Sequence, residues 1–154
     1  MRWLMAFFAC FGLLFACSGA RGAEGKVYKV LPQFLDKDGR TAVSPSLYDR
    51  DAYQAYLRKH PAEISGMRFA VEWKTKGPRW EPLKLRVEMR GVSSGDVPKT
   101  ETIELPVKDR GWFSHWSSVK LDREKYKELG EITAWRVTLW EGDTVLSERK
   151  SFLW

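Results

Sequence analysis

Hydrophobic and polar residues alternate one by one along several stretches of this chain, which is the pattern of half-buried β-strands. The clearest stretches are 67–74 and 83–90, in which apolar side chains take every second position and mostly charged ones lie between. The same alternation, less complete, predicts further strands at 26–35, 103–107, 112–121, 132–140 and 144–154. Seven short strands separated by turn residues predict a mostly β fold of two antiparallel sheets.

A helical period interrupts the strand pattern between the first and second predicted strands. Ser46 begins a capping motif, apolar and aromatic positions then recur at helical spacing, and Pro61 ends the run. The sequence therefore predicts one helix at about 47–60, inserted between the first and second strands. A shorter helical turn is predicted over 122–130, with Gly130 as its C-terminal stop.

Seven strands with a helical turn before the sixth resemble the immunoglobulin or fibronectin type III β-sandwich. The segments 44–58, 134–140 and 151–154 also resemble a group of exported bacterial proteins without assigned function. The resemblance implies one antiparallel immunoglobulin-like β-sandwich domain over 24–154 and no particular activity. The helix at 47–60 departs from the usual pattern, and a jelly roll or a helix-capped small barrel is the alternative fold.

The first 23 residues have the features of an export signal. Arg2 supplies a positive charge, 3–17 is almost entirely apolar, and small residues follow at 18–20. The apolar run is shorter than the ~20 residues that a membrane span needs. We therefore predict cleavage after Ala20 or shortly beyond it, and a periplasmic or extracellular protein. The alternative is an N-terminal anchor helix that stays attached.

The sequence Leu14-Phe15-Ala16-Cys17 resembles the lipobox of bacterial lipoproteins, although Phe15 is bulky for its position. That resemblance implies a second possible form, in which Cys17 is lipidated and anchors the chain to a membrane. Both cysteines of the chain, Cys10 and Cys17, lie in this segment. A chain that begins after Ala20 would therefore contain no disulfide, no thiol nucleophile and no thiolate metal site.

The charge of the chain argues against nucleic acid as a partner. From Glu24 onward there are 24 Lys and Arg against 20 Asp and Glu, a formal charge of +4. The two signs alternate along the predicted strands, with no basic cluster that could follow a phosphate backbone. We expect instead an unknown protein or glycan partner in the cell envelope.

One catalytic motif occurs, in the segment Gly91-Val-Ser93-Ser-Gly95, which matches the G-x-S-x-G pattern of serine hydrolases. That chemistry requires the serine on a strained turn between a strand and a helix. Strands are predicted on both sides here, which favours a flexible loop. A hydrolase that uses Ser93 with His115 and Asp109 is the catalytic alternative, and a carboxylate pair is a further one.

Metal-binding patterns are weak. His60 and His115 are the only histidines, and neither has a partner at the spacing of a zinc site. His60 is expected to cap the helix instead. Asp36-Lys-Asp38-Gly39 opens like a calcium loop but lacks the later ligands, so we predict a tight turn. We expect no metal and no cofactor.

The tryptophans are the best functional lead. Trp73 and Trp135 share the parity of core aliphatic residues, whereas other tryptophans lie on the opposite face or in a loop. Flat aromatic side chains on a sheet can stack on sugar rings or anchor a partner protein. The alternative is that the inserted helix, which is rich in tyrosine, covers that face. The four candidates for ligand contact are Trp80, Trp112, Trp116 and Trp140.

The chain ends on the apolar sequence Ser151-Phe-Leu-Trp154. An exposed apolar end would favour aggregation, so we predict that 144–154 is the last strand, with Phe152 buried. Taken together, the sequence favours an exported, non-catalytic β-sandwich that acts as a binding or accessory domain. The alternatives are a carbohydrate-binding module that uses the exposed tryptophans, and the Ser93 hydrolase.

Overall fold

The computed structural model describes residues 23–109 and 111–154, so the predicted export signal and Cys17 lie outside the described residues. The strands are β1 (Glu24–Leu35), β2 (Gly66–Lys76), β3 (Leu83–Ser93), β4 (Val97–Val107), β5 (His115–Leu121), β6 (Glu131–Glu141) and β7 (Thr144–Lys150). The helices are α1 (Leu47–Lys59), α2 (Arg123–Leu129) and the short 3-10 helix η1 (Pro61–Glu63). No helix in the described part of the chain is long and apolar enough to span a membrane.

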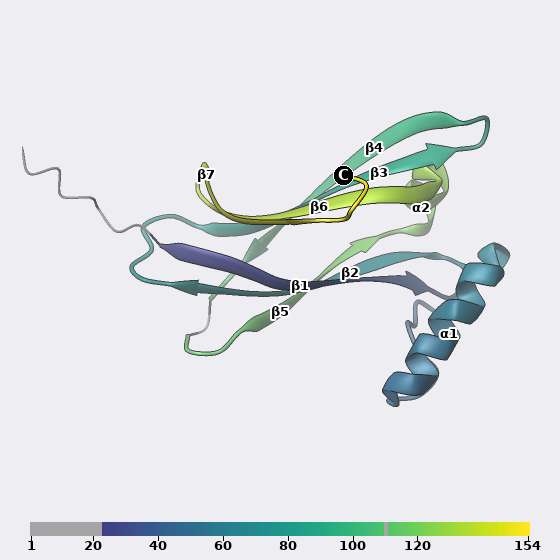
Figure 1. Ribbon diagram of the computed structural model, residues 1–154, viewed down its shortest axis with the longest axis horizontal. Coiled ribbons are helices and arrows are strands. Elements are labelled where there is room, and N and C mark those ends of the chain that lie inside the picture. The colour runs from purple at the N-terminus through teal and green to yellow at the C-terminus, as the bar shows by residue number, and fades with distance from the viewer. Residues whose placement is uncertain (1–22, 110) are drawn as a thin grey trace, which may run out of the picture.

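The seven strands form two sheets, and every pair of neighbouring strands is antiparallel (Figure 1). The smaller sheet has the order β1-β2-β5 and the larger one β4-β3-β6-β7. The chain passes between the two sheets after β2, β4 and β5. The predicted immunoglobulin-like β-sandwich with one inserted helix is confirmed.

The core lies between the sheets, where the period-two pattern of β2 and β3 predicts it. Phe69, Val71 and Trp73 point inward from β2 and are almost fully buried. Leu85 and Val87 face them from β3 and are fully buried. Each such side chain contributes roughly 1.5–3 kcal/mol when it leaves water. This buried layer holds the two sheets together and leaves their outer faces free for polar side chains.

Helix α1 lies at one end of the sandwich (Figure 1), where it buries Leu57 and forms several polar contacts. Its N-terminus is capped by Ser46, whose hydroxyl accepts from the backbone of Asp49. The Gln54 side chain bonds both backbone groups of Phe34, and the Tyr53 hydroxyl donates to Asp36 at 2.8 Å. Gln33 and Ala70, on the outer face of the three-stranded sheet near α1, are buried, whereas the opposite end of that face, where β1 begins, is not covered by the helix.

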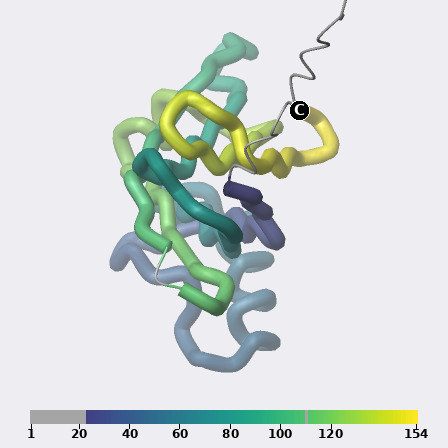
Figure 2. Tube along the Cα trace, turned by 90° about the vertical axis from the view of Figure 1, so that its left-hand side faces the viewer, coloured from purple at the N-terminus to yellow at the C-terminus, as the bar shows by residue number. Residues whose placement is uncertain are grey.

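The two long sides of the sandwich differ. On one side the outermost strands β1 and β7 meet, and the backbone N–H of Val27 donates to the Ser147 hydroxyl at 3.0 Å. On the other side β4 and β5 are the outermost strands, and a hollow of about 530 Å³ lies between them. The loop 108–114 joins β4 to β5 at the end where β1 begins, opposite α1 (Figure 2, viewed from that end).

The prediction for the C-terminus is confirmed for 144–150, which pairs with β6, and wrong for 151–154. Strand β7 stops at Lys150, and the Phe152 side chain is fully exposed. Beyond the bond from the Ser151 backbone N–H to the Trp135 carbonyl, the chain turns, and the Trp154 backbone N–H donates to the Ser151 carbonyl at 3.3 Å. Trp154 takes the docking role that was assigned to Phe152, since its ring lies against the guanidinium groups of Arg90 and Arg136.

Candidate functional site

The loop 108–114 carries two highly exposed aromatic side chains next to each other. Trp112 is 85% exposed and Phe113 78% exposed. Strand β5 begins only at His115, so the predicted strand at 112–121 starts three residues too early. Trp116, on the outer face of β5, is 53% exposed. Trp112 and Trp116 therefore do not share one strand face, and α1 covers neither.

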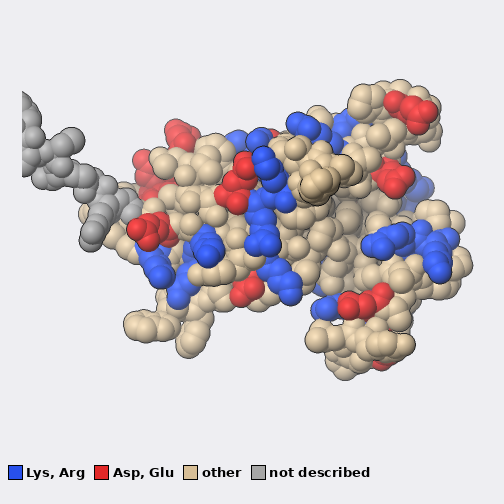
Figure 3. All heavy atoms as spheres, in the orientation of Figure 1, with Lys and Arg blue, Asp and Glu red and all other residues tan. Residues whose placement is uncertain are grey.

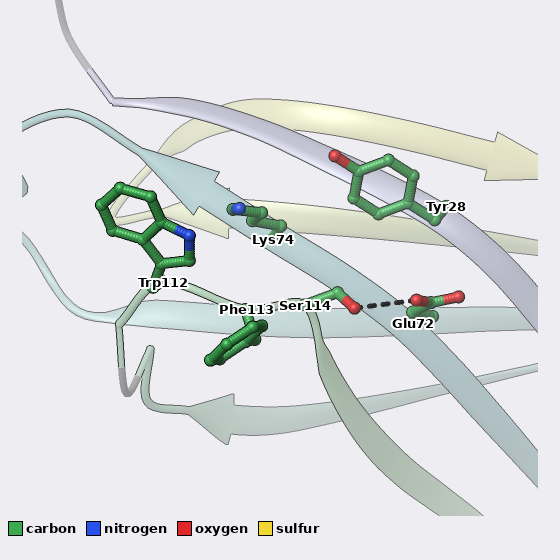
Figure 4. Close-up of a pocket in the computed structure, with 6 residues that line it drawn as sticks. All are labelled: Tyr28, Glu72, Lys74, Trp112, Phe113 and Ser114. Atoms are coloured by element: carbon green, nitrogen blue, oxygen red, sulfur yellow. Dashed lines mark hydrogen bonds between the residues drawn. The ribbon is translucent and has the colours of Figure 1, made fainter.

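A hollow of about 300 Å³ lies beside this loop, on the outer face of the three-stranded sheet. Three of its six lining side chains are aromatic and three are polar. Figure 4 shows Tyr28 and Trp112 on either side of Lys74, with Phe113 below. The six lining residues are Tyr28, Glu72, Lys74, Trp112, Phe113 and Ser114.

Tyr28 reaches the hollow because strand β1 has a β-bulge. The pairing of β1 with β2 shifts register between Val27 and Lys29. Val27 and Val30 are buried, and the two residues between them, Tyr28 and Lys29, both point outward. A bulge of this kind adds one residue and redirects a side chain. It brings an aromatic ring of β1 to the same hollow as the loop 108–114.

The polar side of the hollow comes from β2. Glu72 and Lys74 are alternate residues of this central strand and both point to its outer face. The Ser114 hydroxyl donates to the Glu72 carboxylate at 2.8 Å, which fixes that carboxylate at the base of the loop (Figure 4). A carboxylate that accepts, an ammonium that donates and flat aromatic rings around them are the groups that hold a sugar ring.

A buried carboxylate anchors the loop that carries Trp112. Asp109 accepts from the backbone N–H of Gly111 at 2.7 Å and lies 2.8 Å from His115 Nε2. It also accepts from the Thr75 hydroxyl and pairs with Arg79. Burial on its own raises the pKa of Asp109, but the hydrogen bonds and the Arg79 charge outweigh it and lower this pKa to about 2. Asp109 therefore stays ionised and ties β2, the loop and β5 together.

The expected triad is not assembled. His115 and Asp109 do meet, but Ser93 is at the far end of β3, where its hydroxyl donates to the Val97 carbonyl. Val107 lines the same hollow as His115 and pairs with Leu83, the first residue of β3. Ten strand residues, about 33 Å, separate Leu83 from Ser93. The G-x-S-x-G segment consists of the last three residues of β3 and the first two of the turn to β4, so no helix follows the serine.

The other candidates lie apart from the hollow. Trp80 is 83% exposed in the β2–β3 loop but is not among the lining residues. Trp140 is half-buried on the outer face of the larger sheet, 4.4 Å from the Arg86 guanidinium. His60 ends α1, where its Nδ1 lies 2.8 Å from the Tyr56 carbonyl oxygen.

The calcium-like segment is a tight turn. The carboxylate of Asp36 accepts from the backbone of Asp38 and Arg40 and from the Arg40 side chain. These bonds occupy the oxygens that a cation would need. Within residues 23–109 and 111–154, no group of three or more His, Cys, Asp or Glu could hold a metal ion.

Comparison of the chain with family models, with curated proteins and with solved structures finds no match in any of the three. The resemblance to exported bacterial proteins therefore stays a prediction, and function has to be inferred from the geometry of the hollow. Sequence analysis named Trp112 but missed its partners. Tyr28 depends on a bulge that the alternation does not indicate, and Glu72 and Lys74 look like the ordinary polar face of a strand.

Proposed function

We propose that this protein is an exported, non-catalytic binding domain whose ligand is a saccharide. The observation that carries the proposal is the hollow of Figure 4, in which exposed aromatic rings surround a carboxylate and an ammonium group. Aromatic rings stack on the apolar face of a sugar, while Glu72 and Lys74 bond its hydroxyl groups. Exposed apolar side chains grouped at one site are the usual mark of a binding surface.

The site has the features of recognition rather than of turnover. Trp112 and Phe113 stand on a loop whose backbone the buried Asp109 anchors at Gly111, so the loop is in place before a ligand arrives. A prearranged site binds with less loss of conformational freedom. The hollow is open to solvent on one sheet face, which suits a ligand that continues beyond it, such as a polysaccharide chain.

The test is binding of the purified protein to a glycan array, followed by titration of the best ligands by tryptophan fluorescence. We expect Trp112→Ala to weaken binding about tenfold or more, because a central tryptophan commonly supplies over 1.4 kcal/mol at such a site. Trp80→Ala is the matched control, since Trp80 has nearly the same exposure and does not line the hollow. Equal losses in both variants, or no glycan bound, would contradict the proposal.

Export forms part of the same proposal and rests on the sequence of the first 23 residues. Intact mass of the native protein distinguishes its two forms. A chain that begins near residue 21 or 23 indicates ordinary cleavage, and an acylated chain that begins at Cys17 indicates a lipid anchor. A native protein that retains Met1 would contradict export by either route.

A further inference from the structure

A second hollow of about 160 Å³ adjoins the aromatic hollow and shares Tyr28 and Lys74 with it. It lies where β1 and β2 run side by side, at the end of the sheet where β1 begins. Three of its lining residues are lysines: Lys26, Lys74 and Lys76. The two hollows therefore form one continuous site, with aromatic rings at one end and ammonium groups at the other.

Two of these lysines repel each other when no ligand is bound. Lys26 and Lys74 are direct partners in the register of β1 with β2, and both point to the outer face. Like charges directly opposite each other destabilise a sheet. None of the three lysines forms an ion pair with an acidic residue of the described ranges, although Lys26 Nζ lies 5.2 Å from the Tyr28 ring centroid.

The charge around the site is unbalanced. Lys29 lies on the same outer face, opposite Glu72, so four lysines stand against the two carboxylates of Glu24 and Glu72. Figure 3, which views the side of the sandwich where β1 and β7 meet, shows Lys and Arg side chains at the left end with Asp and Glu side chains among them. An anionic group placed between Lys26 and Lys74 would replace their repulsion by charge-assisted hydrogen bonds.

We infer that the ligand is an acidic saccharide, whose sugar ring lies in the aromatic hollow and whose carboxylate or phosphate lies between Lys26 and Lys74. This inference rests on the proposed function and adds the charge of the ligand. Glu72 excludes a ligand that is anionic along its whole length, because its carboxylate lies in the sugar half of the site. The ligand must instead present hydroxyl groups at one point and an anion at the next.

The first test compares matched pairs of glycans that differ only in charge. The probes are oligouronates and their methyl esters, sialylated glycans and their asialo forms, and phosphorylated oligosaccharides and their dephosphorylated forms. We expect the acidic member of the best pair to bind about tenfold more tightly, with the preference shrinking at high salt. The carboxylate and phosphate pairs distinguish the two possible anions.

The outcomes separate the two proposals. Neutral members that bind as tightly as their acidic partners would overturn the acidic inference and leave the saccharide function standing. No binding to any glycan, or binding only to vesicles of anionic phospholipid, would overturn both. Competition by inorganic phosphate alone, at the same concentration as the acidic glycan, would indicate an anion site without a sugar and would overturn the inference.

A protein variant gives an independent test. Lys26 lines only the second hollow, so we expect Lys26→Gln to lower the affinity for the acidic glycan about tenfold and to change that for its neutral partner less than about twofold. Lys120→Gln is the control, because Lys120 is exposed on β5 of the same sheet, away from both hollows. Trp112→Ala should weaken both glycans. An unchanged acidic preference in Lys26→Gln would overturn the inference.

Discussion

On the outer face of the four-stranded sheet, tryptophans and basic residues are partnered with one another. The Trp154 ring lies 4.1 Å from the Arg90 guanidinium and 4.8 Å from that of Arg136, and Arg136 forms a two-bonded pair with Glu88. On the outer face of the three-stranded sheet, no cation of the described residues stacks on Trp112, and Lys26 has only the Tyr28 ring beside it, 5.2 Å from the ring centroid. The same kinds of side chain stabilise the domain on one face and remain available to a ligand on the other.

The type of cation explains part of this difference. The planar guanidinium of arginine stacks on an indole ring and pairs with a carboxylate through two bonds at once. Lysine presents a strongly hydrated point charge on a flexible stem. Its ammonium group therefore gains less than a guanidinium from leaving water to pair with a neighbouring side chain. On the outer face of the four-stranded sheet (the closed face), the partnered cations are Arg86, Arg90 and Arg136 together with Lys84. On the outer face of the three-stranded sheet (the open face), lysines gather at the end where β1 begins. The difference fits a stabilising role for the first group and a binding role for the second.

The largest expected effect concerns the buried anchor of the open face. Asp109→Asn removes the charge that Thr75, Arg79 and His115 contact, and we expect it to lower the free energy of unfolding by about 2 kcal/mol at pH 7. Ligand binding should weaken as well, because the loop that holds Trp112 loses its support. Urea unfolding measures the first effect and fluorescence titration the second.

The same pair of proteins gives a pH dependence with a definite sign. The pKa of Asp109 falls from 3.8 to about 2 on folding, so its contribution is complete above about pH 5 and is lost as the pH falls from about 4 to 2. The stability difference between the native protein and Asp109→Asn should therefore shrink over that range. Asp143→Asn, in an exposed turn, is the control. A difference that stays constant to pH 2 would contradict the assigned role of Asp109.

The outline of the fold could be predicted from sequence because a strand with one buried face must alternate apolar and polar residues. Strands β2 and β3 each place one face in the core, so a period of two is visible in their residues. Helix α1 was predicted from its cap and its spacing, and it begins and ends within one residue of the expected bounds. The loop 108–114 was not predicted, because Phe113 shares the apolar parity of Val119 and Leu121 and was assigned to their strand, which begins only at His115.

The candidate site could be predicted only in part, since it depends on contacts between segments far apart in the chain. The alternation of residues in β1 does not predict which residues Tyr28 contacts. Its position depends on the bulge, which leaves both Tyr28 and Lys29 pointing outward. Lys26 and Lys74 lie opposite each other because of the register of β1 with β2, which the sequence alone does not specify. Trp112 was named from its parity in the predicted strand 112–121, and it is exposed although β5 begins only at His115.

The closed face is tested by removing its tryptophan. We expect Trp154→Ala to lower the free energy of unfolding by about 1–2 kcal/mol, because it removes a half-buried ring and two cation–π contacts. Trp112→Ala should change stability by less than about 0.5 kcal/mol, since its ring is exposed. Thermal and urea unfolding of the two variants compare the faces directly. Equal losses would show that the faces do not differ in this way.

A smaller effect sharpens the account of the closed face. We expect a double-mutant cycle of Arg136→Met and Trp154→Ala to give a coupling free energy of about 0.5–1 kcal/mol, the size of one partly exposed cation–π contact. The matched cycle of Lys120→Met with Trp154→Ala pairs residues on opposite sheets, and its coupling should be near zero. A coupling near zero in both cycles would mean that Trp154 is held by area burial alone.

The smallest effect is expected at Phe152, two residues from Trp154 and fully exposed. Phe152→Ser removes an aromatic ring that contacts mainly water, so the free energy of unfolding should change by less than about 0.5 kcal/mol. Urea unfolding beside Trp154→Ala makes the comparison within one four-residue turn. A loss as large as that of Trp154→Ala would mean that Phe152 packs against the domain in solution. An unchanged stability together with a lower tendency to aggregate would fit an exposed apolar side chain beside a docked one.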